Sequence, residues 1–465
     1  MKFRIEKDSL GEVKVPSHAL WGAQTQRAVD NFAISGIKMD FPFTKSFVSS
    51  LGLIKDAAAK TNLRLKLISS KKSKAISKAA KEIWQEKHHH QFPIDVFQTG
   101  SGTSSNMNAN EVIGNLASKF LKEKVNPNDD VNMSQSSNDV IPTAIKISAH
   151  LDMTKKLLPS LNELIKEINL KSEKIKGTIK TGRTHLMDAM PIDFSDELSA
   201  WSSQLESSKE NLIFLSKKLL ELPQGGTAVG SGINAHKQFS KYFAQEVTKL
   251  TGNKYKFISS NNFYHELSAQ DCSVQLSGEL KNLAIILTKI SNDLRWMNSG
   301  PLSGLSEIEL KALQPGSSIM PGKINPVIPE AVAMASADVI GNDVSISVAA
   351  QSGSFQLNVM LPVIAYNLLK SINLLSGAMN ALSKKAIRTF KVNHKNLEDS
   401  LLKNPILVTA LNPIIGYEQA AMIAKKAYKE RRPIIEVAVE ETNLSKSRLE
   451  KLLDPKKLAK GGIQK

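Results

Sequence analysis

Four short segments of the chain concentrate hydroxyl, amide, lysine and histidine side chains. The first, QTGSGTSSNMNANEV at residues 98–112, places Ser101, Gly102 and Thr103 just before an expected Asn-rich helix. The free backbone N–H groups at a helix start bind anions, because the helix dipole is positive there. Ser and Thr also serve as simple helix caps, so a purely structural role stays open for this segment.

The second segment, SQSSNDVIPTA at residues 134–144, repeats this arrangement. Ser136, Ser137 and Asn138 lie ahead of a long helix that we expect to begin near Pro142. Hydroxyl and amide donors again precede a helix N-terminus, where they can bind the oxygens of a carboxylate. Two such segments in one chain favour a site for a small anion.

The third segment, GRTHLMDAMP at residues 182–191, carries Thr184 and His185 in an expected connection between two helices. A single histidine is more often a structural residue than a catalytic one. This histidine follows Gly-Arg-Thr in a loop, however, and functional side chains concentrate in loops. An unperturbed imidazole also exchanges protons near neutral pH, which is the range of acid–base catalysis.

The fourth segment, GSSIMPGKIN at residues 316–325, superficially resembles a phosphate-binding loop. Such a loop has four residues between its first Gly and the Gly-Lys pair, followed by a Ser or Thr for magnesium. Here five residues separate Gly316 from Gly322, and Ile324 follows Lys323. The phosphate-loop interpretation therefore fails. Two Pro-Gly pairs punctuate the segment and predict a mobile, non-helical loop.

Together these segments indicate a definite chemistry. Their hydroxyls, amides and Lys323 can bind carboxylate oxygens, while His185 and Glu330 can move protons. Such a set suits abstraction of a proton beside a carboxylate, with fixed donors absorbing the developing charge. A single cysteine, Cys272, excludes cysteine zinc sites and protein-ligated iron–sulfur clusters, and it favours a reducing compartment. We expect no metal and no cofactor.

Three consecutive histidines, His88 to His90, suggest a metal site only superficially. Neither a helix nor a strand points neighbouring side chains in the same direction, so three in a row do not converge on one ion. We expect this run to lie in solvent.

Long helices must hold these loops in place. Apolar residues spaced alternately three and four apart run from Phe194 to Leu222 and from Leu276 to Met297, and a third helical segment runs from Pro142 to about Ile175, with Pro159 as its expected kink. Such spacing is typical of helices packed side by side. Further helices are expected at residues 327–351 and 361–391. The pattern predicts a mostly α fold with a central helical bundle that other subunits of a homo-oligomer complete.

Composition divides the chain of 465 residues into three expected domains. Residues 1–138 mix short helices with polar loops, residues 139–395 hold the long helices, and residues 396–465 form short helical pieces broken by prolines. With 41% hydrophobic and 23% charged residues, the chain resembles an ordinary globular protein.

The net charge of +17 comes from scattered lysines without a long basic run. We therefore expect a lysine-rich surface that attracts small anions, and no nucleic-acid or membrane partner. The first thirty residues resemble neither a signal peptide nor a transit peptide, and no stretch reaches the roughly 18 uninterrupted apolar residues of a membrane span. The expected location is the cytoplasm.

The four segments, in this order, resemble the fumarase/aspartase superfamily and its class II fumarases most closely. The resemblance starts at EKDSLGEVKVPSHALWGAQTQRA and continues through NPNDDVNMSQSSNDVIPTA, GGTAVGSGIN and NDLRW to GSSIMPGKINP. It implies a three-domain, mostly α fold with a twenty-helix core in a homotetramer, and active sites shared by three subunits. The implied activity is reversible hydration of fumarate to (S)-malate in the tricarboxylic acid cycle, without metal or cofactor.

The resemblance also implies roles for single residues. Ser317 is the base that removes the C3 proton of malate, Lys323 and Asn325 stabilise the resulting dianion, and His185 pairs with Glu330 to handle the departing water. The implied anchors of the dicarboxylate are Ser101, Gly102, Thr103, Ser136, Ser137, Asn138, Thr184 and Ser318, together with Lys323 and Asn325.

A second dicarboxylate site is implied at Asn126, Asn128 and Asp129, where family members often carry His in place of Asn126. Two alternative functions stay open. Aspartate ammonia-lyase shares the loop chemistry but carries Gln in place of His185. A non-enzymatic scaffold or nucleic-acid binder would use the positive charge instead.

Overall fold

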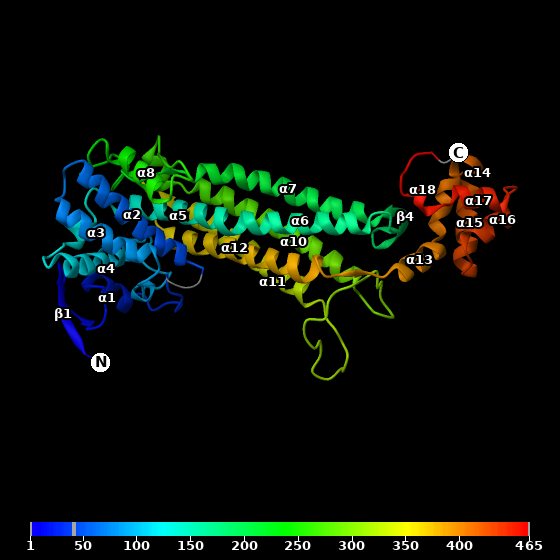
Figure 1. Ribbon diagram of the computed structural model, residues 1–465, viewed down its shortest axis with the longest axis horizontal. Helices are drawn as coiled ribbons and strands as arrows, with labels where there is room; N and C mark the ends of the chain where they lie inside the picture. The colour runs from blue at the N-terminus through cyan, green and yellow to red at the C-terminus, as the bar shows by residue number, and fades with distance from the viewer. Residues whose placement is uncertain (1, 40–42, 464–465) are drawn as a thin grey trace. The chain divides into compact units, whose positions relative to one another are not determined.

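The computed structural model describes residues 2–39 and 43–463. The N-terminal part begins with a β-hairpin, in which β1 (Phe3–Asp8) pairs antiparallel with β2 (Gly11–Pro16). Four helices follow, and Figure 1 shows α2, α3 and α4 side by side. They are α1 (Ala23–Asn31), α2 (Lys45–Arg64), α3 (Ser70–Trp84) and α4 (Thr103–Leu121). The hairpin was not anticipated, and α2 and α4 are longer than the short helices expected here.

The first long helical segment starts earlier than predicted. Helix α5 (Ser137–Asp152) is followed without a break by a π-helical turn (Met153–Leu157) and by α6 (Leu158–Ile175). Pro142 lies inside α5 rather than at its start, because Ser136 and Asp139 form a capping box that fixes the N-terminus. The π-helical turn lies immediately before the predicted kink at Pro159.

The two apolar seams are confirmed by burial. Every apolar seam residue from Phe194 to Leu222 and from Leu276 to Met297 is buried. The helices that carry the seams are α7 (Phe194–Lys218) and α10 (Asp271–Met297). Helix α7 ends four residues before the predicted end of its seam, and β5 (Glu221–Leu222) then pairs in parallel with β6 (Ile258–Ser259). Ser208, which interrupts the first seam, is buried and donates a hydrogen bond to Glu279.

The other helices of the middle region are α8 (Phe239–Leu250), α9 (Phe263–Ser268), α11 (Val327–Ala350) and α12 (Leu361–Leu382). Helices α11 and α12 confirm the expected positions, and a π-helical turn (Ser383–Ile387) extends α12. By length and composition α11 could cross a membrane, although apolar core helices share these properties.

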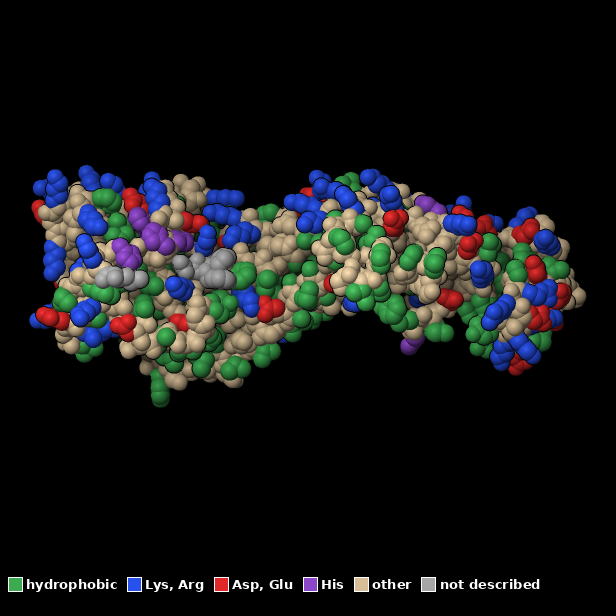
Figure 2. All heavy atoms as spheres, turned by 90° about the horizontal axis from the view of Figure 1, so that it is seen from below, with side chains coloured by type: hydrophobic (Ala, Val, Ile, Leu, Met, Phe, Trp, Pro, Cys, Tyr) green, Lys and Arg blue, Asp and Glu red, His purple; other side chains and the backbone are tan. Residues whose placement is uncertain are grey.

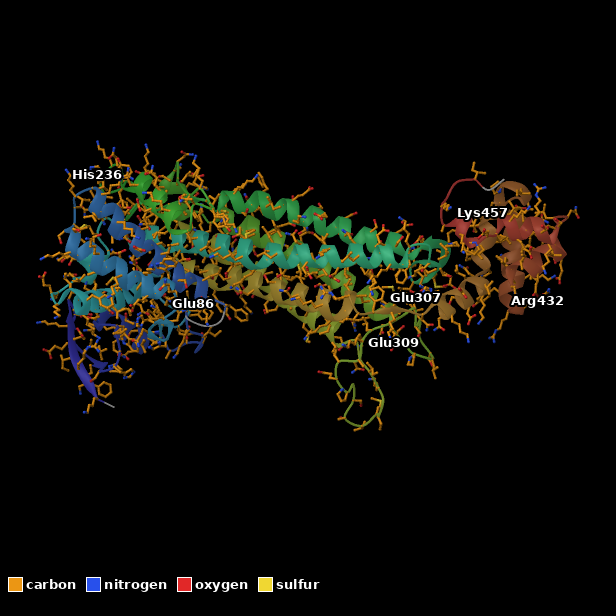
Figure 3. All side chains as sticks on the ribbon, viewed as in Figure 1. Glu86, His236, Glu307, Glu309, Arg432 and Lys457 are labelled. Atoms are coloured by element: carbon orange, nitrogen blue, oxygen red, sulfur yellow. The ribbon has the colours of Figure 1, made fainter. Side chains whose placement is uncertain are left out.

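The C-terminal residues form short helices, and those from residue 405 onward surround a core of their own. These helices are α13 (His394–Lys403), a 3₁₀ turn (Pro405–Leu411), α14 (Asn412–Ile415), α15 (Tyr417–Glu430), α16 (Ile434–Glu441), α17 (Lys446–Leu452) and α18 (Pro455–Leu458). Leu411, Ile423 and Val437 lie at the centre of this core. On its surface Arg432, labelled in Figure 3, pairs with Glu440.

The chain forms two compact units. The first contains Met1–Pro159, Ser208–Ala284 and Ala335–Ser376, and the second contains Ser160–Ser207, Ile285–Met334 and Gly377–Lys465. The three domains expected from composition stay a prediction.

The surface carries its charge as expected. On the face in Figure 2, blue Lys and Arg side chains are scattered, with red Asp and Glu among them. The expectation that the histidine run lies in solvent was wrong for His89, which is buried. The His89 ring lies within hydrogen-bonding distance of the Ile83 carbonyl, while His88 pairs with Glu82. No group of side chains suited to hold a metal ion occurs among the described residues.

Candidate active site

The loop before α4 is shaped by two glycines. Gly102 has a φ of 72°, and a Cβ there would come within 2.8 Å of Ile141. At Gly100 a Cβ would overlap the Val359 carbonyl oxygen, so only glycine fits this close approach. Between them Ser101 is buried, and its Oγ lies 2.8 Å from Thr103 Oγ1. The loop therefore presents paired hydroxyls at the N-terminus of α4.

The segment before α5 caps this helix directly, several residues earlier than the helix start predicted near Pro142. Ser136 Oγ accepts a hydrogen bond from the Asn138 backbone N–H at 3.3 Å, and the Ser136 N–H donates to Asp139 at 2.9 Å. The Asn138 side-chain amide donates to the Ala228 carbonyl at 2.8 Å, and Ser137 Oγ accepts from Asn106. All three predicted anchors are half-buried and fixed by hydrogen bonds.

These two helix N-termini lie close together in the first compact unit. Gly102 begins α4, and Ile141 lies in the first turns of α5, so their close approach brings both helix starts to one place. Each N-terminus contributes a positive partial charge and N–H donors. The predicted anchors Ser101, Thr103 and Ser136–Asn138 therefore lie at two neighbouring helix starts, a setting that favours an anion, and their role in binding stays a prediction.

Buried Asp139 braces this region from the inside. Its carboxylate accepts hydrogen bonds from the backbone N–H groups of Ser136, Gly225 and Thr227. Burial raises the pKa of Asp139 to about 6, although these hydrogen bonds and Lys55 act in the opposite direction. The side chain joins the segment before α5 to the loop at residues 225–227.

The segment with Thr184 and His185 is a β-hairpin in the second unit. Strand β3 (Ile179–Thr184) pairs with β4 (Met187–Asp193), and His185 and Leu186 form the two-residue turn. Both turn residues have positive φ, at 56° and 60°, the combination of a type I′ turn. Residues without glycine's freedom rarely adopt this conformation, so the hairpin holds His185 at an exposed tip under local strain.

A buried carboxylate that the sequence analysis did not identify anchors this hairpin. Glu307 accepts hydrogen bonds from Lys180 Nζ and from Arg183, each at 2.6 Å, and its side chain is only 3% exposed. Lys180 Nζ also contacts Glu197 at 2.8 Å. Both cations lie on β3, so Glu307 fixes the strand that leads directly to His185.

The backbone of Glu307 is equally constrained. Its N–H donates to the Met297 carbonyl at 2.8 Å, and its carbonyl accepts from the Asn393 N–H at 2.9 Å. Immediately after it, β7 (Ile308–Glu309) pairs with β10 (Lys391–Val392). Backbone hydrogen bonds therefore fix the position of Glu307, and its side chain in turn fixes the hairpin.

The loop at residues 316–325 folds on itself. The Gly316 N–H donates to the Lys323 carbonyl at 2.8 Å, and the Asn325 side-chain amide donates to the Gly316 carbonyl at 2.6 Å. Within this closed neck, Ser317 Oγ accepts from the N–H groups of Ile319 and Met320 at 3.2 and 3.0 Å. Two fixed donors thus point at the hydroxyl oxygen of Ser317, which would stabilise negative charge there.

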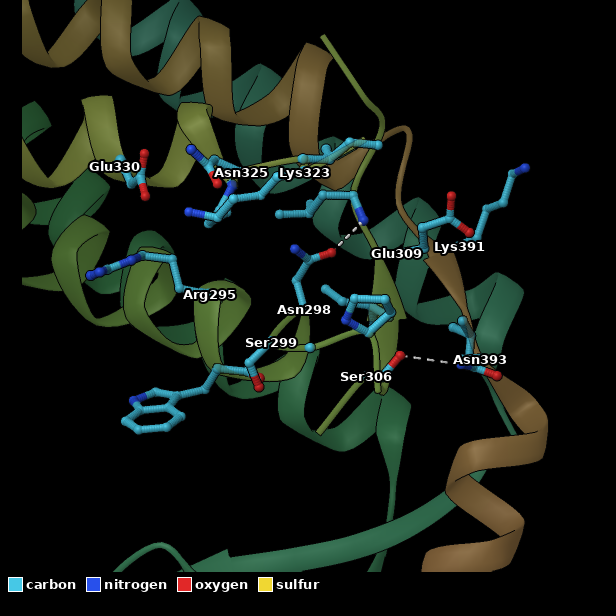
Figure 4. Close-up of a pocket in the computed structure, with 18 of the residues that line it drawn as sticks. Arg295, Asn298, Ser299, Ser306, Glu309, Lys323, Asn325, Glu330, Lys391 and Asn393 are labelled. Carbon is cyan, nitrogen blue, oxygen red and sulfur yellow. Dashed lines mark hydrogen bonds between the residues drawn. The ribbon is translucent and has the colours of Figure 1, made fainter. Parts of the chain in front are cut away.

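A cavity of about 880 Å³ lies beside this loop. Figure 4 shows Glu330, Asn325 and Lys323 along one side, with Arg295 and Asn298 facing them. The last two residues were not predicted, although the NDLRW motif contains Arg295. Cations and a carboxylate in one hollow suit a small polar anion.

The remaining predicted residues differ in their surroundings. Thr184, Ser318 and Lys323 are exposed. Among the hydrogen bonds and ion pairs of the described residues, none joins His185 to Glu330. Asn126 caps the π-helical turn (Pro127–Val131), where its side-chain oxygen accepts from the N–H groups of Asn128 and Asp129. The inferred pairing and the second dicarboxylate site stay predictions.

Comparison with known proteins identifies the family. Residues 11–341 match a protein family described as lyase. Residues 407–460 match a family described as the fumarase C C-terminus. The chain is 56% identical to fumarate hydratase class II 2 of Pseudomonas aeruginosa over 460 residues, which cover 99% of each chain. It is 54% identical over 462 residues to a class II fumarate hydratase of Xylella fastidiosa, with 99% of this chain and 96% of the relative covered.

A solved structure shows the same fold. The class II fumarase of Schistosoma mansoni superposes with a TM-score of 0.95 and 38% identity, covering 98% of this chain and 99% of that one. The mostly α fold expected from the helical seams is thereby confirmed. The chain is an enzyme of the lyase family and belongs, within that family, to the class II fumarate hydratases.

Proposed function

We propose that this enzyme catalyses the reversible hydration of fumarate to (S)-malate, as a step of the tricarboxylic acid cycle in the cytoplasm. The observation that carries the proposal is the 56% identity to a class II fumarate hydratase over 99% of both chains. The physical arrangement of the predicted site supports it, since donors for carboxylates and groups for proton transfer occur in the same four segments.

In the proposed reaction Ser317 removes a proton from C3 of malate. An ordinary serine is too weak an acid to exist as the alkoxide near neutral pH. The two backbone N–H groups that point at Ser317 Oγ offset this weakness, because they stabilise an oxyanion more strongly than a neutral hydroxyl. Lys323, at the neck of the same loop, adds positive charge.

Proton removal leaves a dianionic aci-carboxylate, whose extra charge Lys323 and Asn325 stabilise. The interaction is stronger with this intermediate than with malate, and that difference lowers the barrier. The C2–O bond then breaks with its electron pair on oxygen, and protonation by His185, paired with Glu330, releases water. Fumarate remains, and the reverse sequence hydrates it.

The carboxylates of the substrate would bind to donors on several segments. The proposed anchors are Ser101, Gly102, Thr103, Ser136, Ser137, Asn138, Thr184 and Ser318, with Lys323 and Asn325. The paired N-termini of α4 and α5 support this assignment, because their partial charges favour an anion. The proposed chemistry needs no metal and no cofactor.

We also propose a homotetramer with shared active sites. Helix α11 supports this assembly, because Met334, Val344 and Val348 on it are 69%, 60% and 50% exposed. Apolar side chains repeated along one helix are typical of a surface that another subunit covers. The lack of a hydrogen bond or ion pair between His185 and Glu330 among the described residues is expected if these side chains meet across subunits.

The decisive experiment follows the ultraviolet absorbance of fumarate with malate and then with aspartate as substrate. We expect fumarate from malate only. Formation of fumarate from aspartate but not from malate would refute the proposal and favour an ammonia-lyase. Tight, salt-sensitive binding of DNA or RNA without any lyase activity would favour a nucleic-acid binder.

The proposed base is tested by Ser317→Ala. We expect turnover to fall by about three orders of magnitude, since the reacting base is lost, while the tetramer stays folded because the loop is outside the core. Ser447→Ala, on an exposed position of α17, is the matched control and should keep full activity. Near-normal turnover in Ser317→Ala would exclude Ser317 as the base.

A further inference from the structure

We propose that Lys55, a buried residue of α2, is a positioning residue that holds residues 132–138 in the shape that presents Ser136, Ser137 and Asn138 to the substrate. This inference rests on the proposed function, since it assigns a role within the proposed substrate site. Lys55 itself lies behind the segment and touches no reacting atom.

Lys55 organises the segment by direct hydrogen bonds. Its Nζ donates to Asn132 Oδ1 and to Gln135 Oε1, each at 3.0 Å. The Gln135 side chain in turn donates to the carbonyls of Val131 and Met133, and the Asn132 side chain donates to the Gln135 carbonyl. The ammonium group is thus the centre around which the chain turns immediately before Ser136.

The same cluster reaches the hydroxyl of a proposed substrate anchor. Asn106 and Asn110 of α4 both donate to Asn132 Oδ1 at 3.2 Å, and Asn106 also donates to Ser137 Oγ at 2.9 Å. Because Ser137 Oγ accepts this hydrogen bond, its own O–H is left to donate outward. A carboxylate in front of Ser137 is the acceptor that this orientation suits.

A structural role alone does not explain a lysine at this position. Lys55 is 0% exposed and lies on a helix face with the buried residues Leu51 and Ile54, where an apolar side chain would be expected. Among the described residues, no carboxylate is hydrogen-bonded to its ammonium group. The nearby charge is that of buried Asp139, whose oxygens accept from backbone N–H groups instead. Lys55 therefore interacts with amide oxygens rather than with a direct ion-pair partner.

Two hydrogen-bond acceptors of this cluster have no donor among the described residues. The side-chain oxygens of Asn106 and Asn110 are buried and have no hydrogen-bond partner within the part of the chain that the structure describes. Such oxygens are costly unless a donor or a positive charge lies close by. Lys55 Nζ shares the acceptor Asn132 Oδ1 with the side-chain amides of Asn106 and Asn110, so it belongs to the same buried cluster as these two oxygens.

The test compares Lys55→Met with Lys60→Met. Both lysines belong to α2, but Lys60 is partly exposed and pairs with Asp56. We expect Lys55→Met to raise KM for malate, and the dissociation constant of the unreactive dicarboxylate succinate, about tenfold, because the anchors lose their fixed orientation. We expect kcat to fall by less than about threefold, since the groups that transfer protons are untouched. Lys60→Met should match the wild type.

The outcomes separate this inference from the proposed function. A wild-type enzyme without malate activity refutes the proposed function itself. An active wild type with an unchanged KM in folded Lys55→Met refutes the role of Lys55, as does a loss of kcat at constant KM. If Lys55→Met does not fold, Gln135→Leu removes one acceptor of the ammonium group and carries the same expectation. An unchanged KM in that folded variant also overturns the proposal.

Discussion

Replacing the buried carboxylate Glu307 by glutamine should destabilise the protein and loosen the hairpin that carries His185. Breaking a buried ion pair costs about 3–5 kcal/mol when a charge is left without a partner. Two features reduce this cost here. Lys180 keeps Glu197 at 2.8 Å, and the Arg183 side chain is 17% exposed and therefore partly solvated. We expect a loss of about 2–3 kcal/mol in the free energy of unfolding.

Urea unfolding at a fixed protein concentration measures this loss, since subunit association would otherwise change the apparent stability. Glu309→Gln is the matched control, because Glu309 is exposed two residues further along (Figure 3) and should change stability by less than about 0.5 kcal/mol. Adding Arg183→Met to Glu307→Gln should recover part of the loss, as it removes the cation that has lost its close carboxylate partner. Equal unfolding midpoints for Glu307→Gln and Glu309→Gln would refute the reasoning.

Three further outcomes are expected. Gly316→Ala should lower turnover at least tenfold without lowering the melting temperature, because its Cβ would lie 2.3 Å from the Lys323 carbonyl oxygen. Gly377→Ala on α12, where a Cβ meets no atom within 4 Å, is the control and should keep its turnover, and equal turnover in both variants would contradict the expectation. Burial lowers the pKa of Lys55 from 10.5 to about 7, so the unfolded chain binds more protons between these values and the stability of the wild type should rise with pH there. Urea midpoints measured at several pH values should lack this Lys55 contribution in Lys55→Met. Parallel pH profiles of stability in the two proteins would contradict the expectation. Burial raises the pKa of Cys272 to about 11, so a thiol reagent at pH 8 should react with it slowly until the protein is unfolded, and fast labelling of the folded enzyme would disprove this.

The helical seams could be predicted because burial follows a local period. Leu198, Trp201 and Leu205 repeat at helical spacing, and all three are buried. The predicted start of α5 at Pro142 is too late, because the capping box of Ser136 and Asp139 is a stronger start signal than a proline. The hairpin at His185 was missed because its turn lacks the Asn-Gly or Asp-Gly pair typical of such turns.

The candidate site was predictable only where its residues form compact motifs. Ser101–Thr103 and Ser136–Asn138 each lie beside a helix start, and that position can be recognised locally. Glu307 could not be recognised, because its partners Lys180 and Arg183 are more than 120 residues away. Lys55 is visible in the sequence as a lysine four residues after Leu51 that interrupts the apolar face of α2. An exposed lysine at that position would look the same, so the sequence does not reveal that Lys55 is buried.

The two-residue turn at His185 and Leu186 has a consequence for the engineering of this enzyme. Leu186 adopts a φ of 60°, a conformation that costs a residue with a Cβ about 1 kcal/mol and costs glycine nothing. A screen for thermostability should therefore recover Leu186→Gly. The greater backbone flexibility of glycine would also make the position of the neighbouring His185 imidazole less well defined. Among variants of this hairpin, we therefore expect that the most heat-stable ones are not the ones with the highest turnover.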